Sequence, residues 1–218
     1  MDLLVTIIVT FFAGMGAGLG TGFAGMSAAA VITPMLVTFL GMEPYAAVGI
    51  ALSSDVLASA VSAYTYGKNK NLDVKNGLFM MGSVLVFTVV GSYISSLVPS
   101  SAMGNFSVFM TFLLGIKFIV KPVMTTKEAM QSVSPKKRAL QSIICGMIIG
   151  FICGFVGAGG GMMMLLILTS VLGYELKTAV GTSVFIMSFT ALTGALSHFS
   201  IGGSPDWLIL ALCVIFTF

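Results

Sequence analysis

The hydrophobic positions of the chain gather in long apolar stretches that short polar connections separate. Several stretches approach the roughly 20 residues that cross a bilayer core as a helix, and none alternates like a strand of an outer-membrane barrel. The pattern therefore predicts an all-α polytopic membrane protein. The nine predicted segments are residues 3–20, 26–41, 45–66, 76–97, 103–121, 139–156, 160–173, 178–199 and 207–218.

Composition agrees with this class, because 57% of the 218 residues are hydrophobic and only 8% are charged, far outside the range of soluble domains. The opening MDLLVTIIVTFF has no basic n-region, so we interpret it as a first span that stays in the mature chain. The three cysteines, Cys145, Cys153 and Cys213, lie within apolar segments and form no spaced ligand set. We therefore expect no metal site and no cofactor, and the expected surroundings are a lipid bilayer and not a nucleic acid.

The chain repeats itself at a constant offset of 132 residues. Over 50 positions that begin at Gly14, 14 are identical to those one offset later, against roughly 4 expected by chance. The clearest shared signatures are LGMEPYAAVG and LGYELKTAVG. We predict two homologous halves: repeat one at 1–121, with about five segments, a basic cytoplasmic connection at 122–138, and repeat two at 139–218, with about four. Because repeat two then lacks its last part, we expect a full chain of about 250 residues.

The basic residues predict how the two halves are oriented. Most Lys and Arg residues lie in the loop at 68–75 and in the connection at 121–138, which the positive-inside rule places in the cytoplasm. The counterpart of the first loop, at 200–206, contains no Lys or Arg, whereas Lys177 stands in a loop whose counterpart in repeat one has none. Since five segments, an odd number, separate equivalent points, we predict two inverted-topology repeats.

Two glycine clusters, at 14–25 and 154–161, interrupt the apolar pattern. A glycine inside a helix costs about 0.5–1 kcal/mol relative to alanine, so the clusters need a compensating reason. One reason is close packing of neighbouring helices through small-xxx-small spacing. The glycines with this spacing are Gly14, Gly18, Gly146 and Gly150.

The second reason is a break in the helix. The short segments at 26–41 and 160–173 are then full spans, broken helices or halves of re-entrant hairpins, and the sequence leaves all three forms open. At a break, backbone N–H groups are freed and the next helix adds about half a positive charge at its N-terminus, so an anion site forms without Lys or Arg. A simple hinge or packing role is the alternative. The candidate binding residues at the two breaks are Gly22, Gly25, Ser27, Gly157, Gly159, Gly160 and Gly161.

The third segment contains an isolated acid, Asp55, near the middle of its predicted span. A charge there costs about 2.5–3.5 kcal/mol on insertion scales, so the side chain must face protein or water. Two roles stay open for Asp55: proton coupling in transport, or a hydrogen-bonded structural acid. The only histidine, His198, lies at a segment end, and we interpret it as an interfacial residue rather than a proton relay. The hydroxyls predicted to donate to a substrate are those of Ser53, Ser54, Thr182 and Ser183.

The motifs ITP at 32–34, AAVGIALSSD, TAVGTSVF and GFVGAGGG, together with the Gly-rich opening, resemble the TauE/SafE family of sulfite exporters, or DUF81. The resemblance covers nearly the whole chain in order and recurs in both halves. It implies a multi-pass carrier in the inner (plasma) membrane of a bacterium or archaeon, for sulfite, sulfoacetate or related organosulfur anions. It adds Thr33 and Pro34 to the candidate binding residues, although Leu166 stands at the position equivalent to Pro34 in repeat two.

Our leading hypothesis is a secondary transporter that moves a small oxyanion by alternating access. The chain has no Walker lysine loop, and its membrane segments contain no His/Asp/Glu cluster or base-paired nucleophile, so we expect neither ATP hydrolysis nor another enzyme activity. The alternatives are an ion channel or cation carrier in which Asp55 coordinates the ion, and a membrane scaffold. The sequence leaves the exact anion, the direction, the coupling ion and the oligomeric state open.

Overall fold

The computed structural model describes residues 3–98, 109, 112, 116, 119–120, 135–156, 160–202 and 204–218. Within these residues every regular element is an α-helix, so the predicted all-α class is confirmed. The helices are α1 (Leu3–Ala24), α2 (Ala29–Leu40), α3 (Pro44–Lys68), α4 (Val74–Ser96), α7 (Pro135–Val156), α8 (Gly160–Ser170), α9 (Leu176–Gly202) and α10 (Trp207–Thr217). The predicted segment at 103–121 and most of the predicted connection at 122–138 lie outside the described residues.

Four of the described helices, α1, α3, α4 and α9, are long and apolar enough to cross a membrane. By contrast, α2 has 12 residues and α8 has 11. These lengths correspond to about 18 and 16 Å at the helical rise, well short of a hydrocarbon core of about 30 Å. A full span is therefore wrong for the segments at 26–41 and 160–173, and both are short helices that follow a glycine cluster.

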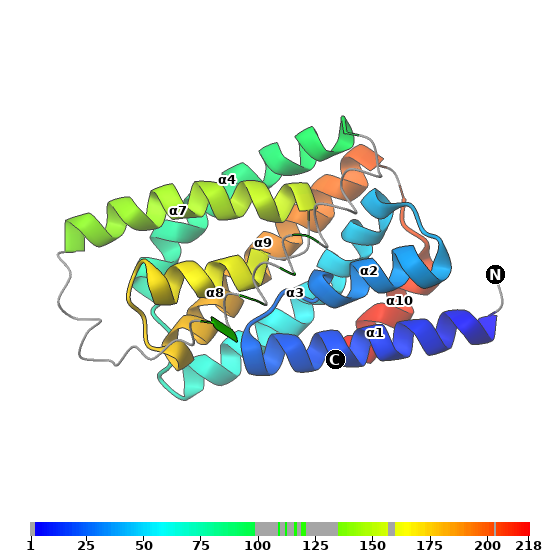
Figure 1. Ribbon diagram of the computed structural model, residues 1–218, viewed down its shortest axis with the longest axis horizontal. Coiled ribbons are helices and arrows are strands. Elements are labelled where there is room, and N and C mark those ends of the chain that lie inside the picture. Colours follow the sequence, from blue (N-terminus) through cyan, green and yellow to red (C-terminus); the bar gives the residue numbers. More distant parts are fainter. Residues whose placement is uncertain are drawn as a thin grey trace.

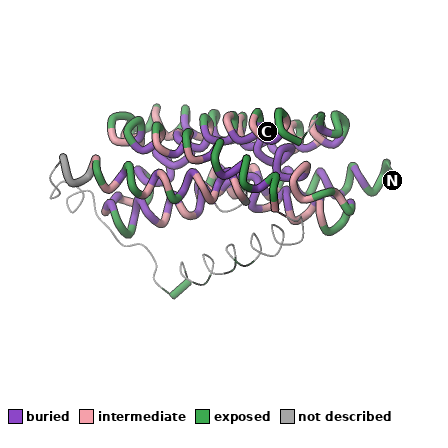
Figure 2. Tube along the Cα trace, turned by 90° about the horizontal axis from the view of Figure 1, so that it is seen from above, coloured by how far each residue is buried: buried purple, intermediate pink, exposed green. Residues whose placement is uncertain are grey.

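The long helices pack in pairs from distant parts of the chain (Figure 1). α7 lies along α4, α9 lies along α3, and α10 lies along α1. In the same view α8 and α2 lie one after the other along the long axis, between α7 and α1. Buried positions lie between layers of helices, and exposed positions face outward (Figure 2). The exposed side chains include Phe12, Phe39 and Val86, as expected for a surface that contacts lipid tails.

The offset of the sequence repeat recurs in the helix boundaries. α1, α2, α3 and α4 begin at Leu3, Ala29, Pro44 and Val74. α7, α8, α9 and α10 begin at Pro135, Gly160, Leu176 and Trp207, each within one residue of the 132-residue offset. In both parts of the chain a long helix is followed by a short one and then by another long one, whereas the fourth helix has 23 residues in α4 and 11 in α10.

Two equivalent helix ends also share their local geometry. Gly41 after α2 and Gly173 after α8 have φ angles of 60° and 67°, which favour glycine because it has no Cβ. The N–H of Met42 donates to the carbonyl of Leu36 at 3.2 Å, and the equivalent bond from Tyr174 measures 2.8 Å. Each end is thus closed by an equivalent backbone hydrogen bond after a left-handed glycine.

The predicted close packing is confirmed at the small-xxx-small glycines Gly14, Gly18, Gly146 and Gly150. A Cβ at Gly150 would lie 2.9 Å from Cα of Val84 on α4. A Cβ at Gly14 would lie 2.7 Å from Cβ of Phe216 on α10. The absence of side chains at these positions therefore lets α7 approach α4, and α1 approach α10.

Gly150→Ala is expected to lower the thermal stability of the purified protein, because the added methyl group would meet the backbone of α4. Overpacking of this kind costs about 1–3 kcal/mol, so the Tm measured in detergent should fall by several degrees. Gly82→Ala on α4 is the matched control, since a Cβ there has nothing within 4 Å. Equal Tm values for the two variants would contradict the packing role of Gly150.

Candidate functional site

The first glycine cluster ends α1 in a tight turn. α1 ends at Ala24, and residues 25–28 connect it to α2. Gly25 has a φ of 63°, and its N–H donates to the carbonyl of Thr21 at 3.1 Å. A Cβ at Gly25 would lie 2.8 Å from Oγ of Ser183, so the turn packs directly against α9. The predicted helix break is present at this cluster.

The second glycine cluster lies between α7 and α8. α7 ends at Val156, and α8 begins at Gly160. Gly157 and Gly159 lie outside the described residues. Gly160 and Gly161 form the buried start of α8. The chain therefore leaves one helix and begins another at the second cluster as well.

The starts of α2 and α8 meet in the middle of the molecule (Figure 1). A Cβ at Gly161 would lie 2.5 Å from the backbone nitrogen of Ser27 and 2.8 Å from the carbonyl oxygen of Gly25. The first turn of α8 thus touches the turn that precedes α2. Because the N-terminus of a helix has a partial positive charge, two starts in contact form a region of positive potential.

Asp55 on α3 is fully buried and accepts hydrogen bonds at both carboxylate oxygens. Oγ of Ser27 donates to Oδ2 at 2.6 Å, and Oγ of Ser59 donates to Oδ1 at 2.6 Å. The N–H of Ala28 also donates to this carboxylate, and the N–H of Ala29 donates to Oγ of Ser27 at 3.3 Å. Asp55 therefore binds Ser27, which the sequence predicts as a ligand-binding residue, and also the N–H of Ala28.

The four predicted hydroxyls have different surroundings. Ser183 is buried and lies against Gly25, as described above. Oγ1 of Thr182 accepts a hydrogen bond at 3.1 Å from the N–H of Asp73, in the connection before α4. Three of the four hydroxyls donate to carbonyls of their own helix, those of Ser53, Ser54 and Ser183. The structure thus places Ser183 at the first break, while Thr182 fixes a neighbouring loop.

α2 contains two further candidates, Thr33 and Pro34. Thr33 is buried, and its Oγ1 has no hydrogen-bond partner within the described part of the chain. Pro34 lies inside the helix, and because it has no N–H, the carbonyl of Ala30 lacks its usual helical donor. A buried hydroxyl without a partner is uncommon and points to an interaction with a ligand or water.

Tyr66 and His198 make equivalent contacts that the sequence interpretation missed. The hydroxyl of Tyr66 donates to the carbonyl of Gly22 at 3.2 Å, and Nε2 of His198 lies 3.1 Å from the carbonyl of Gly154. The offset of 132 residues relates both the two side chains and the two glycines. His198 is 1% exposed, so its side chain packs inside the protein. Comparing polar side chains at the repeat offset would have found this pair.

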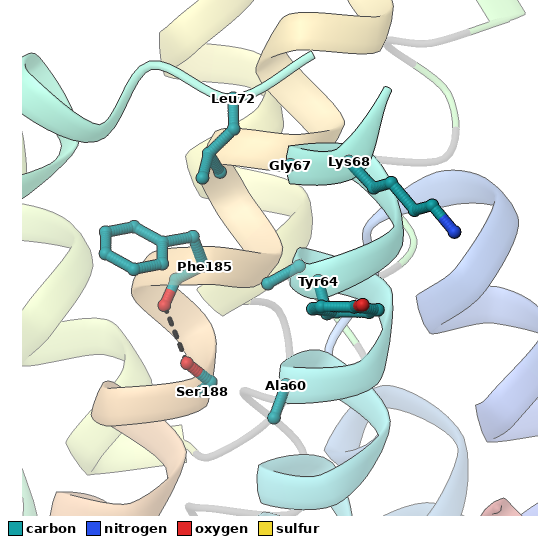
Figure 3. A pocket seen from close by; sticks show the side chains of 8 residues that line it. Ala60, Tyr64, Gly67, Lys68, Leu72, Phe185 and Ser188 are labelled. Atoms are coloured by element: carbon teal, nitrogen blue, oxygen red, sulfur yellow. Dashed lines mark hydrogen bonds between the residues drawn. The ribbon is translucent and has the colours of Figure 1, made fainter. Parts of the chain in front are cut away.

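A groove of about 580 Å³ lies between α3 and α9 (Figure 3). Its lining is mainly apolar, with Tyr64 and Lys68 on α3 and with Phe185 and Ser188 on α9. Tyr64 and Lys68 are exposed, so the groove is open to the surface. The predicted binding residues do not line this groove. The contact between the starts of α2 and α8 is therefore a different place in the molecule.

Long apolar spans, broken helices and a buried acid between them are features of membrane transporters. The chain is a multi-pass membrane transporter. It belongs to the TauE/SafE family: residues 10–218 match the family model described as Sulfite exporter TauE/SafE. This assignment confirms the resemblance seen in the sequence motifs.

Relatives in bacteria and archaea have the same general description. The chain is 27% identical to the probable membrane transporter protein YunE of Bacillus subtilis, over 95% of this chain and 82% of the relative. It is 28% identical to a probable membrane transporter protein of Methanocaldococcus jannaschii, over 99% of this chain and 83% of the relative. No solved structure matches the chain. The protein is a transporter of the bacterial or archaeal plasma membrane and not an enzyme.

Proposed function

We propose that the chain is a secondary transporter that moves a small oxyanion, sulfite or an organosulfur anion, by alternating access. The observation that carries this proposal is the contact between the starts of α2 and α8, where Gly161 lies against Ser27. Two facing helix starts contribute together about one positive charge in a place that water does not screen. Lys68, Lys70, Lys75 and Lys177 are exposed. Backbone dipoles are therefore the proposed source of anion affinity.

Alternating access is common in carriers built from two inverted repeats. The directions of equivalent helices in the two halves support such an arrangement. In Figure 1, α1 runs from the N-terminal mark towards the opposite end of the molecule, and the equivalent helix α7 runs back the other way. Such a relation is expected for inverted-topology repeats, whose substrate lies between discontinuous helices near the bilayer midplane. In this proposal, the two halves rotate relative to each other during transport, and the contact between α2 and α8 stays in place.

Asp55 is the proposed proton-coupling residue. Its carboxylate occupies donors at the start of α2, through Ser27 and Ala28, so a second anion at this place meets a like charge. Protonation of Asp55 removes that charge, and anion entry is therefore favoured together with a proton.

The proposed function is tested by flux into proteoliposomes that contain the purified full chain. Labelled sulfite, thiosulfate, sulfate, sulfoacetate and taurine are compared with and without an imposed proton gradient. We expect saturable flux of at least one sulfur oxyanion, and the gradient should stimulate it. The absence of flux for every anion would contradict the substrate class, and large cation-selective currents would favour the channel alternative.

A further inference from the structure

Two side chains of different chemistry close equivalent helix ends. Tyr66 at the end of α3 reaches the carbonyl of Gly22, two residues before the last residue of α1. His198 near the end of α9 reaches the carbonyl of Gly154, two residues before the last residue of α7. In each part of the chain, the second long helix therefore contacts the last turn before the break.

These carbonyls need a donor from outside their own helix. The last four carbonyls of a helix have no intrahelical partner. At the end of α1, the N–H of Gly25 is bonded to Thr21 and the N–H of Met26 is bonded to Gly20. The hydroxyl of Tyr66 supplies the donor for Gly22.

The histidine contact fixes the form of the imidazole ring. A carbonyl oxygen only accepts hydrogen bonds, so Nε2 of His198 must carry the hydrogen in its contact with Gly154. Nδ1 has no hydrogen-bond partner within the described part of the chain. The ring packs on Tyr45, with 4.2 Å between ring centroids. What Tyr66 and His198 share is thus a polar donor at the tip of a rigid aromatic ring.

We propose that Tyr66 and His198 are positioning residues for the anion site. Each holds the final turn before a glycine break, and each thereby keeps the following short helix in the place where α2 and α8 touch. Gly22 is followed three residues later by Gly25, which packs against Ser183, so a shift of this turn would move one wall of the site. This inference rests on the proposed function, because it assigns the two residues a role in anion binding.

The first test removes each donor and restores one of them. Tyr66→Phe and His198→Phe keep an aromatic ring but lose the hydrogen bond, whereas His198→Gln keeps an N–H donor at a similar reach. We expect an apparent KM for the transported anion about five-fold higher in both phenylalanine variants, with a maximal rate near that of the wild type. His198→Gln should stay within about two-fold of the wild type. Unchanged KM values in the phenylalanine variants, or a glutamine variant as impaired as His198→Phe, would overturn the proposal.

The second test needs no substrate and uses hydrogen exchange measured by mass spectrometry. Tyr66→Phe should speed exchange in peptides that cover residues 20–28, and His198→Phe should do so in peptides that cover 150–156. His198→Gln should exchange like the wild type. Faster exchange without a change in KM would show a purely structural role and overturn the proposal. A wild-type protein without any anion flux would remove the proposed function, while the exchange pattern would still decide whether the two donors hold the helix ends.

Discussion

Asp55→Asn is expected to make anion transport independent of the proton gradient. Asparagine keeps the shape of the side chain and one acceptor oxygen, but it cannot release or take up a proton. Its amide also places a donor opposite one of the two serine hydroxyls, Ser27 and Ser59, that now donate to the carboxylate. The lost hydrogen bond costs about 1–3 kcal/mol, so the variant should fold with a lower Tm.

The measurement is flux of sulfate, whose own charge is constant near neutral pH, so that any response reports on the protein. In the wild type, we expect an inward proton gradient to raise the rate of uptake by about ten-fold, which corresponds to about 1.4 kcal/mol of coupling. In Asp55→Asn, the rate should be the same with and without the gradient. Ser59→Ala is the control, because it removes one hydrogen bond and keeps the acid. Full gradient stimulation in Asp55→Asn would show that Asp55 is a structural acid.

Gly161→Val is expected to abolish transport by separating the starts of α2 and α8. A Cβ at this position would meet backbone atoms of Ser27 and Gly25 at 2.5 and 2.8 Å. Backbone cannot turn aside as a long side chain can, so the two helix starts must move apart. Overpacking costs about 1–3 kcal/mol, and loss of the facing dipoles removes the attraction for an anion.

We expect anion affinity, measured by equilibrium binding of the labelled anion to purified protein, to fall about 100-fold in Gly161→Val. Gly82→Ala serves as the control, since the added methyl group has open space and lies outside the site. A less disruptive variant, Gly161→Ala, should show an intermediate loss of affinity. Normal anion affinity in a folded Gly161→Val protein would contradict the role of the helix starts.

The sequence predicted the helices well because hydropathy and glycine clusters act locally. The segment expected at 45–66 is the helix Pro44–Lys68, and the one expected at 139–156 ends at Val156. The break at the first cluster follows from Gly25, whose positive φ is costly for other residues. Hydropathy and glycine positions therefore predict the helices without any information about which helices pack together.

The contacts of the site depend on tertiary packing and could not be predicted in the same way. The bond between Asp55 and Ser27 joins residues 28 positions apart, and periodicity within α3 says nothing about the partner of its acid. Thr182 and Ser183 are adjacent in the sequence, but a helix turns by about 100° per residue, so their side chains point in different directions. Thr182 binds the loop before α4, while Ser183 lies against Gly25 at the first break. The equivalence of Tyr66 and His198 was hidden because the two residue types differ.

A structure of the protein determined with the sulfur oxyanion that gives the highest flux is the most direct test. We predict density for the anion beside the contact between the starts of α2 and α8, within hydrogen-bond distance of backbone N–H groups of Gly160 or Gly161 and of Ser27. Density in the groove beside Lys68, with unoccupied helix starts, would contradict the central claim that backbone dipoles at two helix breaks bind the anion.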